Sequence, residues 1–99
     1  MLITKEKTDN TIVLRVEGKI DTLTSPELEQ AIADTYEDCG KLVLDLSKVD
    51  YISSAGLRVI VVAHREMEKH DGLIIRNLSK NVKNVLTITG FYKTLNIEE

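Results

Sequence analysis

The sequence predicts an α/β fold, one domain at residues 1–99 in which an opening β-hairpin precedes alternating strands and helices. The chain's 99 residues suffice for one hydrophobic core. Apolar residues make up 42% of the chain and aromatic residues only 4%, so we expect a core of Leu, Ile and Val. Apolar runs of strand length alternate with amphipathic runs of helix length. This order predicts a mixed, mostly parallel sheet of about four or five strands with about three main helices.

The first two predicted strands form the hairpin. They lie at residues 2–7 and 11–18, and in the second every other side chain from Ile12 to Val16 is a large aliphatic one. This alternation is typical of a sheet with one dry face. Residues 8–10, Thr-Asp-Asn, have turn chemistry and join the two strands.

A helix follows, and its start signal is the run Thr-Ser-Pro-Glu. In one interpretation Ser25 caps this helix with Pro26 at its first position. In the other, Thr24 caps the helix and Glu27 closes a capping box. Gly40 is expected to end the segment. The apolar face of this helix carries Leu28, Ala31, Ile32 and Tyr36.

A dense apolar run at residues 41–46 predicts a buried strand of a parallel sheet. Ser53 or Ser54 is then expected to cap a second helix, which ends at Asp71 and Gly72. The predicted buried stripe of this helix consists of Leu57, Ile60, Val61 and Met67.

The last part of the chain repeats the pattern. Residues 73–75 predict a further apolar strand. Ser79 is expected to cap a third helix that Gly90 closes. Residues 91–97 then form an edge strand or a final turn. Because strands alternate with helices after the hairpin, we expect right-handed crossovers and all three helices on one face of the sheet.

Composition and charge exclude several classes of protein. The net charge of −3 and the pI near 5.4 argue against a nucleic-acid partner. Cys39 is the only cysteine, which excludes a disulfide framework within the chain and a cysteine metal site. The N-terminus has no apolar stretch of signal-peptide length, and the longest apolar run, Val59 to Ala63, is too short to span a bilayer. We therefore expect a cytoplasmic protein with no direct membrane contact, no cofactor and no metal.

The most informative segment is residues 49–58, Val-Asp-Tyr-Ile-Ser-Ser-Ala-Gly-Leu-Arg, which joins a buried strand to a helix. The carboxyl ends of parallel strands are where α/β proteins place their sites. A helix N-terminus tolerates a phosphate, here on Ser53 or Ser54, because it offers unpaired N–H groups. Gly56 is expected to leave the first turn uncovered for a partner. The alternative is an ordinary serine cap with no further function.

Residues 45–57, Asp-Leu-Ser-Lys-Val-Asp-Tyr-Ile-Ser-Ser-Ala-Gly-Leu, resemble the signature of STAS domains, the sulfate-transporter and anti-sigma factor antagonist family. Residues 18–21, Gly-Lys-Ile-Asp, are similar to the family's Gly-x-hydrophobic-Asp after the second strand. The resemblance extends across the chain and includes its length and order of elements. It implies a STAS fold of the anti-sigma factor antagonist type.

In antagonists of this family the phosphorylated residue lies two positions before the motif glycine, which implies Ser54 as the phosphoacceptor. The family often has Asp just before the acceptor, whereas this chain has Ser53, which becomes the alternative acceptor. Asp21 and Asp45 match acidic positions of the family, although a plain turn role for Asp21 is equally open. The residues expected to contact a partner are Asp21, Ser53, Ala55, Gly56, Leu57 and Arg58.

The resemblance implies a regulatory protein and not an enzyme. It would bind an anti-sigma factor that is also a serine-protein kinase, release a sigma factor, and be switched off by phosphorylation at Ser54. A metal-dependent serine/threonine phosphatase would reset it, and the free protein is expected to be a monomer. One alternative is a non-phosphorylated STAS adaptor subunit of a membrane transport or signalling complex. Another is a small nucleotide-binding module, which only Asp21 and the helix N-terminus support.

Overall fold

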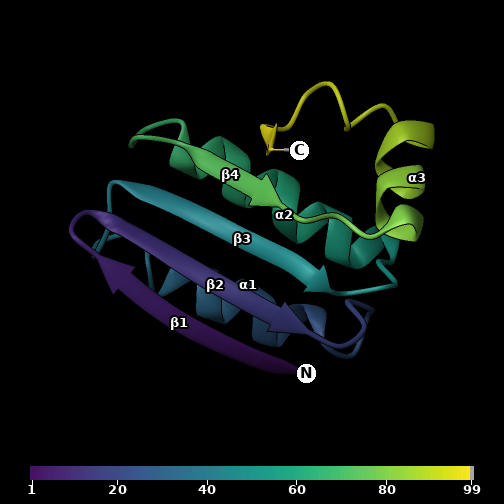
Figure 1. Ribbon diagram of the computed structural model, residues 1–99, viewed down its shortest axis with the longest axis horizontal. Coiled ribbons are helices and arrows are strands. Elements are labelled where there is room, and N and C mark those ends of the chain that lie inside the picture. Colours follow the sequence, from purple (N-terminus) through teal and green to yellow (C-terminus); the bar gives the residue numbers. More distant parts are fainter. Residues whose placement is uncertain (99) are drawn as a thin grey trace.

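The computed structural model describes residues 1–98, and its strands and helices follow the predicted order (Figure 1). The chain opens with the hairpin, alternates helices with strands, and closes with a strand of 2 residues. The elements are β1 (Leu2–Thr8), β2 (Thr11–Glu17), α1 (Ser25–Ala33), β3 (Lys41–Lys48), α2 (Ser54–Met67), β4 (Leu73–Arg76), α3 (Lys80–Ile88) and β5 (Ile97–Glu98).

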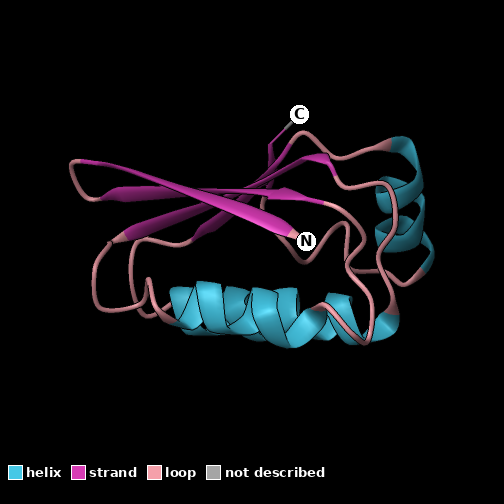
Figure 2. Cartoon of the chain, turned by 90° about the horizontal axis from the view of Figure 1, so that it is seen from below, coloured by secondary structure: helices cyan, strands magenta, loops and turns pink. Residues whose placement is uncertain are grey.

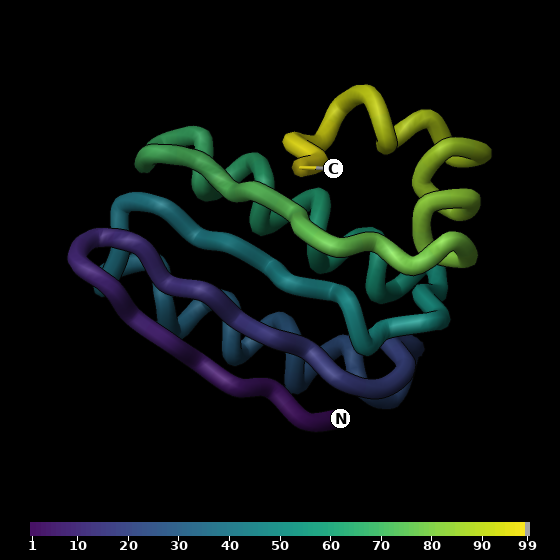
Figure 3. The backbone as a smooth tube through the Cα atoms, in the orientation of Figure 1, coloured from purple at the N-terminus to yellow at the C-terminus, as the bar shows by residue number. Residues whose placement is uncertain are grey.

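Within residues 1–98, one 5-stranded sheet has the order β1-β2-β3-β4-β5. The hairpin strands β1 and β2 are antiparallel, and every other neighbouring pair of this sheet is parallel. As Figure 3 shows, the chain therefore starts at one edge of the sheet and finishes at the opposite edge. The predicted class, a mixed and mostly parallel sheet, is confirmed.

The core lies between one face of the sheet and two helices. Figure 2 shows α1 and α2 together below the sheet. Because side chains alternate along a strand, every second residue of β2, β3 and β4 points to these helices. These inward side chains are at most 2% exposed: Ile12, Leu14, Val16, Leu42, Leu44, Leu46, Leu73 and Ile75. The stripe predicted on α2 is buried as well: Leu57, Ile60, Val61 and Met67.

The expectation that all three helices share one face of the sheet is wrong for α3. This helix stands at the end of the sheet (Figures 1 and 2). Asn77, directly after β4, has a φ of 61°, so the chain turns away from the strand direction there. Ser79 caps α3 as predicted, since its Oγ accepts the N–H of Val82 at 3.2 Å. Val82 and Leu86 then extend the same core.

The opposite face of the sheet is not covered by α1 or α2 and carries a row of charged side chains. Four positions align across β2 to β5: Arg15, Asp45, Arg76 and Glu98. Arg15 also approaches Glu6 of β1 at 3.3 Å, and Arg76 meets Glu98 at 2.7 Å. Exposed pairs of this kind contribute little stability. They do oppose register shifts, because a slip of one residue would turn these charges into the core.

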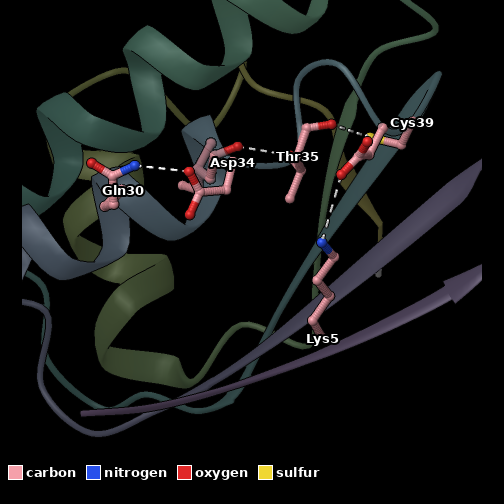
Figure 4. Close-up of polar contacts among 7 residues, drawn as sticks. Lys5, Gln30, Asp34, Thr35 and Cys39 are labelled. Carbon is pink, nitrogen blue, oxygen red and sulfur yellow. Dashed lines mark hydrogen bonds and ion pairs between the residues drawn. The ribbon is translucent and has the colours of Figure 1, made fainter.

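The first helix ends earlier than predicted, at Ala33 rather than near Gly40. The buried Thr35 explains this difference. Its hydroxyl donates to the carbonyl oxygen three residues back at 2.7 Å, and the N–H groups of Thr35 and Tyr36 also bond three residues back. Such bonds tighten the chain and stop the helix. Figure 4 shows the segment after it, where the sulfur of Cys39 donates to the carbonyl of Thr35 at 3.3 Å.

Candidate functional site

Two loops far apart in the sequence meet at the carboxyl ends of β2 and β3. Ile20 and Ile52 form an isolated parallel bridge. The N–H of Ile20 donates to the carbonyl of Tyr51 at 3.0 Å, and the N–H of Ser53 donates to the carbonyl of Ile20 at 2.8 Å. The bridge continues the parallel pairing beyond the ends of the strands. It therefore brings together the two motif segments around Asp21 and Ser53.

Ser53 is the residue that caps α2. Its backbone is extended, with φ −90° and ψ 173°, and its Oγ accepts the N–H of Gly56 at 3.2 Å. This bond satisfies one of the N–H groups that a helix start leaves unpaired. The sequence left Ser53 and Ser54 as alternatives for the cap, and the structure assigns this role to Ser53.

Ser54 is the first residue of α2 and is exposed. Within residues 1–98, its hydroxyl has no hydrogen-bond partner. The neighbouring serine therefore has a structural task, and Ser54 has none. A negative group on Ser54 would face the start of the helix, where the helix dipole and the free N–H groups favour it.

Gly56 has a different task from the one the sequence suggested. It is buried, and a Cβ at this position would lie 2.3 Å from Cγ2 of Ile20 and 3.1 Å from the Ile20 carbonyl oxygen. The expectation that Gly56 leaves the outer surface of the helix open is wrong, because its missing side chain points inward. Gly56 instead lets the first turn of α2 rest directly on the bridge between Ile20 and Ile52.

Asp21 organises the turn that leads into α1. Its Oδ1 accepts the N–H groups of Leu23 at 2.9 Å and Thr24 at 3.0 Å. In return, Oγ1 of Thr24 accepts the N–H of Asp21 at 2.9 Å. This is the reciprocal pattern of a capping box, placed one turn before the helix. The turn role considered for Asp21 is confirmed, and contact with a partner stays a prediction.

Neither predicted side-chain cap of α1 forms, although Thr24 does occupy the N-cap position. Thr24 bonds to Asp21 and makes no side-chain cap of its own, so Glu27 closes no capping box. The hydroxyl of Ser25 donates to the carbonyl of Asp21 and does not accept from the helix. Pro26 does occupy the start of the helix as predicted. The Asp21 carboxylate instead accepts the N–H groups of Leu23 and Thr24, which precede the helix.

The hydrogen bonds of Asp21 also set its ionisation. The N–H of Thr24 is the largest cause that lowers the pKa of the Asp21 carboxyl. Desolvation opposes this shift, and the N–H of Leu23 and the charge of Lys19 add to it. The carboxylate form is thus the one that the turn binds.

A shallow groove of about 500 Å³ runs along α2 from Ser54. Its lining is Ser54, Leu57, Arg58, Val61, Val62, Arg65 and Phe91. Of the residues expected to contact a partner, Arg58 is exposed, Gly56 and Leu57 are buried, and the other three are half-buried: Asp21, Ser53 and Ala55. Because Gly56 faces inward, it does not line the groove, whereas Ser54, Leu57 and Arg58 do.

Three groove residues were not among the predicted contacts: Val62, Arg65 and Phe91. Helical periodicity could have indicated Val62 and Arg65, because positions 54, 58, 62 and 65 follow the spacing of one helix face. Phe91 had no such signal, since only the fold brings the segment after α3 to this groove. Val62 is 49% exposed, which is unusual for a valine and adds an apolar contact.

Asp45 lies on the open face of the sheet. Its carboxylate accepts the N–H of Ser47 at 3.0 Å and the side-chain amide of Asn77 at 3.1 Å. Desolvation is the largest influence and opposes the shift, but these hydrogen bonds together lower the pKa of Asp45. The strand alternation directs this side chain away from the helices, so it does not join the Ser54 groove.

Among residues 1–98, no group of three His, Cys, Asp or Glu side chains is placed to hold a metal ion. In the same part of the chain, no helix has the length and apolar character needed to cross a membrane.

The fold and the two joined motif segments define a family. Residues 3–99 match the family model of the STAS domain. The chain belongs to the STAS domain family.

Several relatives point to one type within this family. The chain is 34% identical over 94 residues to BtrV of Bordetella bronchiseptica, covering 92% of this chain and 80% of BtrV. It is 31% identical over 97 residues to the anti-sigma-B factor antagonist of Listeria monocytogenes, covering 95% and 84%. A crystal structure of an anti-sigma factor antagonist from Mycobacterium paratuberculosis has a TM-score of 0.88 and 31% identity, covering 97% and 83%. The predicted resemblance to the antagonist type is confirmed.

The close contact of Gly56 with Ile20 should make a side chain at position 56 destabilising. Gly56→Ala should lower the free energy of unfolding by about 1–3 kcal/mol, because the new methyl group overpacks against Ile20. Urea denaturation measures the loss. Ile20→Leu removes the Cγ2 branch that the methyl group would meet, so Gly56→Ala should cost less in that background. An equal cost in both backgrounds would show that this contact is not the cause.

The two serines should differ in their effect on stability. Ser53→Ala removes the cap and should lower the free energy of unfolding by about 1 kcal/mol. Ser54→Ala should change it by less than about 0.5 kcal/mol. Ser79→Ala, which removes the equivalent cap of α3, is the matched control and should resemble Ser53→Ala. Equal losses at positions 53 and 54 would contradict the assignment of the cap.

The stability contributed by Asp21 should depend on pH. Because its folded-state pKa is lowered, the contribution is fully present above the ordinary value of 3.8 and is lost as the pH falls through the folded pKa. Asp21→Asn keeps an acceptor but removes the charge. In urea denaturation, the free energy of unfolding of the wild type should exceed that of this variant at neutral pH. The difference between the two should be smaller in acid. A difference that does not change with pH would contradict the role of the charge.

Proposed function

We propose that this chain is a single-domain anti-sigma factor antagonist that phosphorylation at Ser54 switches off. In its unmodified form it binds an anti-sigma factor that is also a serine-protein kinase, and a sigma factor is released. One observation carries the proposal. Ser54 is exposed and, within residues 1–98, its hydroxyl has no partner, whereas the hydroxyl of Ser53 is held in the helix cap. Membership of the family and the antagonist relatives support the class of partner.

Ser54 is the better acceptor of the two serines. In the transfer, Oγ of Ser54 attacks the γ-phosphorus of ATP held by the kinase. The new O–P bond forms as the bond to ADP breaks, and the hydroxyl proton passes to a base of the kinase. The same reaction at Ser53 would first require the hydroxyl to leave the N–H of Gly56. This difference supports Ser54 over Ser53 as the phosphorylation site.

The phosphate would act on the interface rather than on the fold. It adds nearly two negative charges at the start of a helix of 14 residues, a position that stabilises negative charge. The cap at Ser53 and the close contact of Gly56 with Ile20 hold the backbone beneath it. A partner packed on Ser54 would have to desolvate or repel the new charge, so binding would fail without a large motion of the domain.

A metal-dependent serine/threonine phosphatase would reset the switch by directing water onto the phosphorus, which releases inorganic phosphate and restores the hydroxyl. The chain itself would have no catalytic role and would need no cofactor. It would act in the cytoplasm, as a monomer when free.

Phosphate mapping tests the proposal directly. The purified chain is incubated with ATP and the anti-sigma factor kinase of the same organism, and the modified residue is identified by mass spectrometry. We expect phosphate on Ser54 in the wild type and in Ser53→Ala, and none in Ser54→Ala. The phosphorylated chain should bind the kinase at least about tenfold more weakly in calorimetry, because the partner leaves the phosphate charge on Ser54 without a partner charge in the interface.

One result would count against this function, and another would count only against the assignment of Ser54. A chain that takes up no phosphate on either serine would be a static adaptor and not a switch. Phosphate that persists in Ser54→Ala would move the site to Ser53 and leave the switch itself in place.

A further inference from the structure

The four arginines of the chain fall into two groups. Arg15 and Arg76 lie on the open face of the sheet and pair with Glu6 at 3.3 Å and Glu98 at 2.7 Å. The other two are exposed on α2 and line the groove next to Ser54: Arg58 and Arg65. Within residues 1–98, neither has a carboxylate partner. The groove therefore holds two unpaired guanidinium groups.

The carboxylates near the groove are engaged elsewhere. Glu66 approaches Lys69 at 3.4 Å, and Glu68 approaches His64 at 3.8 Å. Asp50, in the loop before α2, accepts the side-chain amide of Asn81 at 3.2 Å. No acidic residue of the described chain lines the groove. The groove is thus positively charged although the chain as a whole carries a net charge of −3.

The floor of the groove is apolar. Among its lining residues, Leu57 and Val61 are buried, Phe91 is half-buried and Val62 is 49% exposed. An apolar floor with two cations at its rim suits a peptide segment that inserts an aliphatic or aromatic side chain and carries carboxylates next to it. Charge complementarity therefore selects an acidic segment of the partner protein as the occupant.

Ser54 and Arg58 are four residues apart on the same helix, so their side chains lie one above the other. An arginine at this spacing reaches a phosphoryl group on the serine and matches its oxygens with two N–H donors. Arg65 lies about three turns after Ser54, on the order of 16 Å along the helix axis, and cannot reach the same phosphate. Of the two groove arginines, Arg58 is the one that lies within one helical turn of Ser54.

We propose that Arg58 is the residue through which the phosphate acts, binding a carboxylate of an acidic partner segment in the unmodified chain and the Ser54 phosphoryl group in the modified chain. This inference rests on the proposed function and specifies the chemistry of its partner. The phosphate is covalently attached one turn away, so it competes for Arg58 at a high effective concentration. It also places a dianion in a groove that receives an acidic segment. Loss of the cation and repulsion of the segment both weaken binding.

Phosphoserine installed at position 54 during protein synthesis tests the pairing without any kinase. The second pKa of the phosphate is followed by phosphorus NMR in the otherwise unchanged full-length chain, in Arg58→Gln and in Arg65→Gln. Arg58→Gln should raise this pKa by about half a unit, because a nearby cation favours the dianion. Arg65→Gln is the matched control and should leave it unchanged. Equal pKa values with and without Arg58 would overturn the pairing.

A binding cycle tests the partner. Calorimetry without ATP measures the affinity of the anti-sigma factor kinase for chains with serine or phosphoserine at position 54, each with Arg58 retained or with the substitution Arg58→Gln. In the unmodified chain, Arg58→Gln should weaken binding about tenfold, and the further loss caused by phosphate should shrink by a similar factor. Arg65→Gln should weaken binding but leave the loss caused by phosphate as large as before. Circular dichroism of each variant excludes unfolding as the cause.

The outcomes separate this inference from the proposed function. An affinity that Arg58→Gln leaves unchanged or raises would overturn the acidic occupant, even if phosphate still abolishes binding. A kinase that does not bind the unmodified chain would overturn the proposed function and the partner half of this inference. The phosphorus titration would then still decide whether Arg58 holds the phosphate.

Discussion

The candidate site depends on one close approach, that of Gly56 to Ile20. A Cβ on Gly56 would lie 2.3 Å from Ile20, so glycine allows α2 to begin here without displacing Ile20. The backbone of Ile20 in turn forms hydrogen bonds with Tyr51 and Ser53, the two residues that flank Ile52. A packing constraint in the core thereby determines where the first turn of the helix stands relative to the turn at Asp21.

This constraint separates the roles of two identical neighbours. Because the backbone at Ser53 is fixed in the extended region by its bond to Ile20, its hydroxyl faces the helix and accepts the N–H of Gly56. The next residue has already entered the helix, and its side chain points outward. Composition cannot distinguish the two serines, but their places relative to the cap give one a structural task and leave the other available for chemistry.

Local signals predicted most of the fold, and the failures have a common cause. Apolar runs and periodicity located the helices and the first four strands, whereas they did not distinguish a strand from a turn at the last strand, Ile97–Glu98. Turn chemistry located the cap at Ser79 and narrowed the cap of α2 to Ser53 or Ser54. The sequence did not show that the hydroxyls of Thr24 and Ser25 would bond to Asp21 and leave α1 without a side-chain cap, nor that Gly56 would face inward. These features depend on contacts between segments distant in sequence. Phe91 at the groove is a further case, since only the placement of α3 at the end of the sheet brings it there.

The serine at position 53 also affects the charge around Ser54. An aspartate caps a helix about as well as a serine does, so stability alone does not require Ser53. An aspartate there would, however, put a permanent negative charge next to any phosphate on Ser54. With a neutral cap, the helix dipole and the cation of Arg58 act on that phosphate without a competing carboxylate at the cap. The neutral serine at position 53 and the arginine one turn after Ser54 would thus favour the same result. A phosphate on Ser54 would be held by its own helix, and Arg58 would no longer be available to the partner.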